Sequence, residues 1–124
     1  MYSTDIYNAL NVTAITSLLD AYGTGYALFS DMVIPADCYA KKTINFYQLG
    51  VIDCRLDYGL ATYTINCRAE TKAEAMTIAV AVVNTINLES YTTYRLYCQI
   101  QQGLQPQDNT DVYNIPVEVT IKRK

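Results

Sequence analysis

Few residues in this chain have the types and spacing that catalysis needs. The sequence has no histidine, the side chain that most often serves as a general base near neutral pH. Asp53 and Asp57 flank Arg55 in an alternating stretch, which predicts a row of charges on one face of a strand and not a paired acid and base. The serines lie in no nucleophile motif. We therefore expect a protein that is not an enzyme.

The residues that bind metals and cofactors are equally sparse. The four cysteines, Cys38, Cys54, Cys67 and Cys98, include no C-x-x-C pair, whereas zinc sites normally cluster cysteine with histidine. Gly23 and Gly25 form only G-x-G, short of the G-x-G-x-x-G loop that binds dinucleotides. We predict no metal centre and no cofactor, with Cys67 and Cys98 on the inward faces of strands.

The composition describes one globular domain, residues 1–124. Hydrophobic residues make up 51% of the chain and charged residues 17%, and the net charge of −3 offers no basic face for nucleic acid. No apolar run approaches the roughly 20 residues that a membrane span needs. The opening residues lack the basic and apolar parts of a secretory signal. Tyrosine occurs 12 times, which suits protein–protein interfaces but also ordinary strands in which tyrosine replaces phenylalanine.

The stretch 62–87 predicts a strand that leads into a long helix. Tyr63, Ile65 and Cys67 alternate with polar residues, which is typical of a strand with one buried face. Thr71 and Glu74 then match the capping box: the Thr71 hydroxyl accepts from the N–H of Glu74, and the Glu74 carboxylate reaches back to the N–H of Thr71. Apolar side chains recur from this point at helical spacing: Ala75, Ala79, Val82, Val83 and Ile86.

The same helix carries a second apolar line formed by Met76, Val80 and Val83. A helix that is apolar around most of its girth is buried on more than one side. A second helix of the same subunit accounts for this pattern, and so does another copy of the chain.

The other elements complete an α+β fold. We expect a first helix over 3–21 with a possible break near Asn11, a connection over 26–40 with a short extended piece, and strands over 41–49, 93–102 and 112–122. Residues 49–59 form a long arm or a strand of their own, and residues 103–111 an exposed loop. Pro116 places the last strand at an edge or points outward from the sheet. The result is an antiparallel sheet of about four strands with two main helices packed on one face.

The segment from Asn66 to Ala75, NCRAETKAEA, joins a strand to an Ala- and Val-rich helix. Together with the first helix, the Ile34-Pro35 connection, the arm and two closing strands, it resembles the tail terminator, or tail completion, proteins of long-tailed bacteriophages. That resemblance implies a homohexameric ring that caps the tail tube, ends its polymerisation and meets the head–tail connector protein. It also implies that DNA passes through the lumen without specific binding, and that the ring assembles in the host cytoplasm and lies in the tail and neck of the virion.

In such a ring we expect the arm to reach a neighbouring subunit. The candidate interface residues are Asp53, Arg55, Asp57, Tyr58, Met76 and Val80. Two alternatives stay open. One is another neck or tail-tube protein, of which a tube protein polymerises by itself; the other is a small α+β ligand-binding module with a concave apolar pocket.

Overall fold

The structure is a computed structural model that describes residues 2–38, 41–50, 59–101 and 112–124. Within these ranges the elements are α1 (Tyr2–Leu10), α2 (Thr13–Thr16), β1 (Ala21–Tyr22), β2 (Gly25–Tyr26), β3 (Leu28–Phe29), the 3-10 turn η1 (Ala36–Cys38), β4 (Thr43–Gly50), β5 (Gly59–Ala69), α3 (Lys72–Ile86), β6 (Tyr94–Ile100) and β7 (Tyr113–Arg123). The described strands form a 5-stranded sheet in the order β3-β4-β5-β7-β6, and β1 pairs with β2 in a small hairpin. The predicted α+β class is confirmed.

Alternation along each strand decides which side chains of the sheet form the core. Ile44 pairs with Cys67, Phe46 pairs with Ile65, and Ile65 also pairs with Val117 across the antiparallel ladders. All five side chains have no measurable exposure to solvent. The alternate positions carry Thr, Asn, Gln, Glu, Lys and Arg, so the sheet has one apolar face and one polar face.

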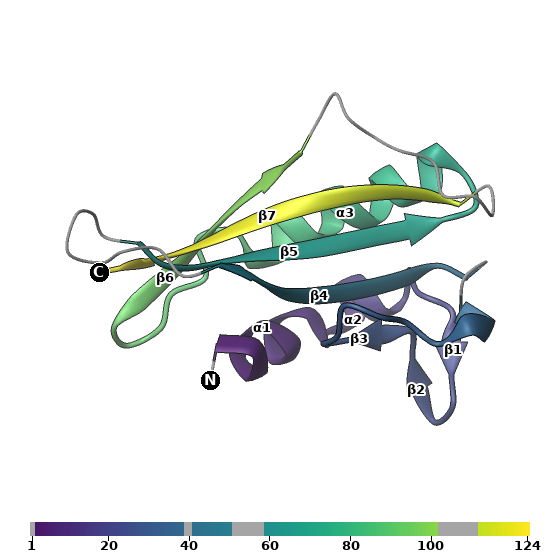
Figure 1. The fold of residues 1–124 in the computed structure, drawn as a ribbon, viewed down its shortest axis with the longest axis horizontal. Coiled ribbons are helices and arrows are strands. Elements are labelled where there is room, and N and C mark those ends of the chain that lie inside the picture. Colours follow the sequence, from purple (N-terminus) through teal and green to yellow (C-terminus); the bar gives the residue numbers. More distant parts are fainter. Residues whose placement is uncertain (1, 39–40, 51–58, 102–111) are drawn as a thin grey trace.

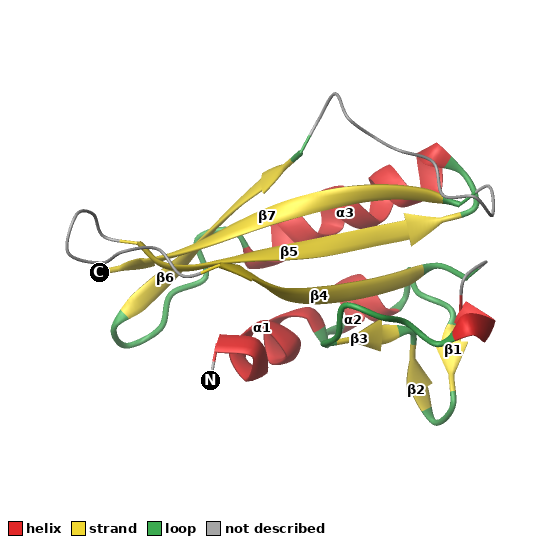
Figure 2. Cartoon of the chain, in the orientation of Figure 1, coloured by secondary structure: helices red, strands yellow, loops and turns green. Residues whose placement is uncertain are grey.

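The helices lie on the apolar face. In Figure 1, α3 runs behind β5 and β7, and it packs on β5, β6 and β7. The helices α1 and α2, red in Figure 2, contact α3. They contribute Ile6, Leu10 and Ile15 to the same buried cluster. This arrangement matches the prediction of two main helices on one face of the sheet.

The first helix is shorter than predicted. It ends at Leu10, and a second short helix begins at Thr13 after a break at Asn11 and Val12. Val12 is extended, with φ −129° and ψ 157°, and its carbonyl oxygen accepts from the N–H of Thr16 at 2.8 Å. The β-branched residues that surround this break are poor helix formers. The helix therefore ends at Thr16, and residues 17–20 form a turn that leads into β1.

A short edge strand adds a parallel pairing to the predicted antiparallel sheet. Leu28 pairs with Ile44 and Phe29 with Asn45, so β3 runs parallel to β4. The segment after β3 is anchored by a second small core, formed by Ala27, Ile34 and Cys38. The extended piece that we expected in the connection is therefore the edge strand β3.

The last strand lies inside the sheet, between β5 and the edge strand β6. The strand is therefore not at an edge, and the other prediction for Pro116 holds: it points outward from the sheet. Its side chain lies on the polar face, between the buried residues Ile115 and Val117. The N–H of Gln101 donates to the oxygen of Pro116 at 2.9 Å, one residue past the end of β6. The proline nitrogen therefore faces the point where β6 ends, and its missing hydrogen interrupts little of the ladder.

The predicted arm and loop fall mainly outside the described residues. The strand β4 ends at Gly50 and β5 begins at Gly59, and the two pair as antiparallel neighbours. Residues 51–58 and 102–111 are not described, so the predictions about the arm at 49–59 and the loop at 103–111 stay predictions.

Candidate assembly surfaces

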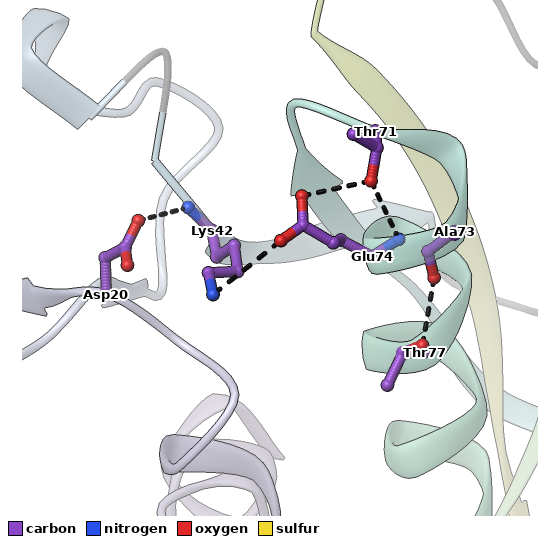
Figure 3. Close-up of polar contacts among 6 residues, drawn as sticks. All are labelled: Asp20, Lys42, Thr71, Ala73, Glu74 and Thr77. Atoms are coloured by element: carbon purple, nitrogen blue, oxygen red, sulfur yellow. Dashed lines mark hydrogen bonds and ion pairs between the residues drawn. The ribbon is translucent and has the colours of Figure 1, made fainter.

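The start of α3 is fixed by the capping pair that the sequence predicts. The N–H of Glu74 donates to Oγ1 of Thr71 at 3.2 Å, as in a capping box. The predicted return bond is different: the Glu74 carboxylate accepts from the Thr71 hydroxyl at 3.0 Å (Figure 3). Its second oxygen lies 3.8 Å from Nζ of Lys42, whose backbone N–H donates to Asp20 at 2.8 Å. Glu74 thereby links the helix start to the segment that leads into β4.

The helix α3 has a buried face and an exposed face. The buried side chains are Ala75, Ile78, Ala79, Val82 and Ile86. Ile78 is absent from the predicted apolar positions, although it lies at the correct spacing between Ala75 and Val82. The exposed face contains Ala73, Thr77, Val80 and Asn84, and the Thr77 hydroxyl donates to the Ala73 oxygen at 2.9 Å.

Of the predicted interface residues, the structure describes two. Met76 is half-buried and packs against the core, and Val80 is 42% exposed one turn further along α3. The helices α1 and α2 cover one flank of α3, as expected for packing within one subunit, and leave Val80 in solvent. Packing of another copy of the chain on the exposed flank stays a prediction. Asp53, Arg55, Asp57 and Tyr58 lie outside the described residues, so whether they come near α3 stays a prediction.

A shallow hollow beside this face was not predicted. It has a volume of about 150 Å³, lies between α2 and α3, and is lined by Ser17, Leu18, Lys42, Glu74, Thr77 and Ile78. Thr77 belongs both to the hollow and to the exposed face of α3, so the two form one continuous surface.

A second exposed apolar surface comes from the segment after β3. Met32 is 64% exposed and Val33 is 71% exposed, although Ile34 beside them is buried. The segment is held because Nδ2 of Asn45 donates to the oxygens of Asp31 at 3.0 Å and Met32 at 3.4 Å. The sequence shows these residues as an apolar run before Pro35, and only the pairing of β3 with β4 reveals which of them face solvent.

Tyrosines fill the core at the opposite end of the sheet. The ring of Tyr94 packs edge-on against Tyr2, with centroids 4.9 Å apart, and stacks on Tyr91 at 4.7 Å. The hydroxyl of Tyr94 donates to the Asp5 carboxylate, and that of Tyr91 donates to the Asp5 oxygen at 3.3 Å. Burial, together with Asp5, raises the pKa of Tyr94 and that of Tyr91. For these tyrosines, packing within the subunit accounts for the residue type without an interface.

The described cysteines behave as small core residues. Cys38 and Cys67 are buried and Cys98 is half-buried, and all three are free thiols. Burial raises the pKa of Cys67 and raises that of Cys98 to about 12, so both thiols stay protonated near neutral pH. Across the described ranges, no group of three potential metal ligands lies close enough to hold an ion. Within the same ranges, no helix has the length and apolarity required to cross a membrane.

The end of β7 is held in place by hydrogen bonds to the turn before β6. The N–H of Lys124 donates to the Thr93 oxygen at 3.1 Å, and its Nζ donates to the Tyr91 oxygen at 3.0 Å. The ladder between β6 and β7 extends to the pair of Tyr94 with Arg123. The pattern of charges at 122–124 gives no indication of these bonds, because they are made to the turn before β6.

The fold is similar to that of a solved virion component. Over 98% of this chain and 92% of the other, it matches a chain in the structure of the virion of a native gene transfer agent particle, with a TM-score of 0.64 and 15% sequence identity. The sequence matches no protein-family model and no curated protein. At this identity the likeness concerns the fold, and it extends through both helical and strand regions of the chain.

Proposed function

We propose that the chain is a structural protein of a phage-like virion, and that it acts as a tail terminator. In this role it forms a homohexameric ring in the tail and neck, caps the tail tube, ends tube polymerisation and joins the tube to the head–tail connector protein. DNA passes through the lumen without specific binding. The observation that carries the proposal is the end-to-end likeness of the fold to a chain of the gene transfer agent virion, which agrees with the resemblance of 66–75 to terminator sequences.

The surfaces of the subunit support assembly over catalysis. A ring built from head-to-tail contacts needs two different surfaces on each subunit, which meet by rotation. The exposed face of α3 with its adjoining hollow supplies one candidate, and Met32 with Val33 supplies another. The net charge of −3 also suits a ring that lets DNA pass, because holding DNA requires neutralisation of phosphates by lysine and arginine.

The interface residues form part of the proposal. Met76 and Val80 contribute from α3, and Asp53, Arg55, Asp57 and Tyr58 contribute from the arm at 49–59. We expect the double change Arg55→Ala and Asp57→Ala to weaken ring formation while the monomer stays folded, because charged rims set the register of interfaces more than the stability of a subunit. Sedimentation velocity measures the fraction of protein in rings, and circular dichroism checks that the variant is folded. Unchanged assembly would show that these two residues of the arm do not contribute to the interface.

The deciding experiment is native mass spectrometry across a concentration series. A species near six times 13.9 kDa supports the terminator ring. Long polymers would favour a tail-tube protein instead, since a terminator stops polymerisation and does not propagate it. A strict monomer at every concentration would contradict a free ring and favour the small ligand-binding module.

A further inference from the structure

A basic hollow lies at the end of the sheet where β7 finishes, on the side where Figure 1 marks both N and C. It has a volume of about 540 Å³ and is lined by Tyr2, Thr92, Thr93, Arg123 and Lys124. A guanidinium, an ammonium and hydroxyl groups therefore border it, and none of the described residues that line it has a carboxylate side chain. All of these groups are able to donate hydrogen bonds, and the two cations accept none.

The walls of the basic hollow are held by contacts within the subunit. Arg123 lies opposite Tyr94 in the β6–β7 ladder, and the ring of Tyr94 packs edge-on against that of Tyr2. The backbone N–H and the Nζ of Lys124 bind the turn before β6 at 3.1 and 3.0 Å. A site whose walls are already ordered loses less conformational entropy when it binds a ligand.

The charge of the basic hollow is local. Lys122 belongs to the opposite, polar face of the sheet, where its Nζ lies 5.3 Å from the centre of the Tyr97 ring. Arg123 and Lys124 are thus the two cations of the hollow. Asp5, on helix α1, is the acidic residue nearest to Tyr2 in the sequence. Its carboxylate accepts from the hydroxyl of Tyr94 and is therefore already hydrogen-bonded within the subunit.

We propose that the basic hollow docks an acidic peptide segment of a partner protein, and this inference rests on the proposed role in virion assembly. The guanidinium of Arg123 matches the planar geometry of a carboxylate, and Lys124 supplies a second charge for a neighbouring acid. A volume of about 540 Å³ accommodates a few side chains. The segment that fits has adjacent aspartate or glutamate residues.

Nucleic acid fits the same cations less well. Strong duplex binding neutralises roughly 6–10 phosphates, whereas two cations line the hollow and Lys122 faces away from them. The net charge of −3 also opposes a long polyanion more than a short acidic segment.

The test measures binding of a fluorescein-labelled hexaglutamate peptide by fluorescence anisotropy at low salt. We compare the native protein with Arg123→Gln/Lys124→Gln and with a matched control, Lys72→Gln/Lys122→Gln, which removes two charges outside the hollow. Loss of charge-assisted hydrogen bonds should weaken binding about tenfold in the first variant. The control should change binding less than about twofold, since long-range terms between exposed charges are screened. Circular dichroism checks that both variants fold.

Three outcomes overturn the proposal: no binding of the peptide to the native protein, equal weakening in the two variants, or tighter binding of a DNA oligonucleotide of matched charge. The peptide result is independent of the ring measurement. A ring that does not bind the peptide leaves the terminator role intact and refutes the docking site. A monomer that binds the peptide through Arg123 and Lys124 supports the docking site and contradicts the ring.

Discussion

Single side chains at the start of α3 set where the helix begins. Thr71 is the N-cap residue of α3, and its side chain accepts from the N–H of Glu74. Thr71→Ala should therefore lower the free energy of unfolding by about 1 kcal/mol. Thr77→Ala is the matched control, because that exposed hydroxyl only donates to the Ala73 oxygen within the helix. Urea unfolding measures both, and equal losses would show that the cap has no special role.

The buried phenol of Tyr94 makes stability depend on alkaline pH. Burial and Asp5 raise its folded-state pKa above the ordinary value near 10. The unfolded chain then loses the proton first as pH rises, so this contribution to stability is complete below about pH 10 and declines above it. The Tyr94→Phe variant has no phenol hydroxyl and therefore lacks this pH-dependent contribution to stability. The difference in free energy of unfolding between native protein and variant should narrow from about pH 8 to about pH 11.

The same comparison separates Tyr94 from the two thiols that titrate at alkaline pH. Cys67 and Cys98 also have raised pKa values, but they are present in both proteins and their effects cancel in the difference. A difference that stays constant across this pH range would mean that the phenol titrates in the folded protein as it does in the unfolded chain.

Among the elements, α3 has two faces that should contribute differently to the free energy of unfolding. Ile78 is 1% exposed and Val80 is 42% exposed on the same helix. Ile78→Ala should lower the free energy of unfolding of the monomer by about 2–5 kcal/mol, because it leaves a cavity in the buried cluster. Val80→Ala should change it by less than about 0.5 kcal/mol. Denaturant unfolding at a protein concentration that keeps the chain monomeric checks both values, and similar losses would contradict the assignment of faces.

The elements differ in how far the sequence alone could predict them. Alternation identified β5, β6 and β7 and their inward side chains, and the cap and apolar period identified α3, because these signals are local. The position of β7 between β5 and β6 depends on pairing between distant segments, which no local pattern encodes. The edge strand β3 is two residues long, and its parallel pairing with β4 became visible only in three dimensions.

The candidate surfaces divide in the same way. Met76 and Val80 could be selected because an apolar line on a helix is readable from spacing. Met32 and Val33 could not be distinguished from buried Ile34, since all three are apolar neighbours in an irregular segment. Arg123 and Lys124 could not be selected either, because the hollow that they line forms only when β7 pairs with β6 and Lys124 binds the turn before β6.

For the whole molecule, the proposed ring makes the exposed face of α3 the surface to test. Val80→Asp introduces a charge that would lose its water if this face is buried between subunits, so we expect the ring to dissociate while the monomer stays folded. Val12→Asp is the matched control, because Val12 is 38% exposed and stands at the N-cap of α2, where aspartate is favourable. Light scattering after size exclusion measures the mass of the assembly. A ring that still forms with Val80→Asp would show that the exposed face of α3 is not in the interface.

The position of β7 between β5 and β6 has a consequence for biosynthesis. The strand that joins β5 to β6 is the last of the described strands to leave the ribosome. Until it arrives, a nascent chain holds β6 without its ladder partner and leaves the apolar side chains of β5 and α3 only partly covered. The domain must therefore complete its sheet after translation of residues 113–123, and chaperones have their opportunity to bind during that interval.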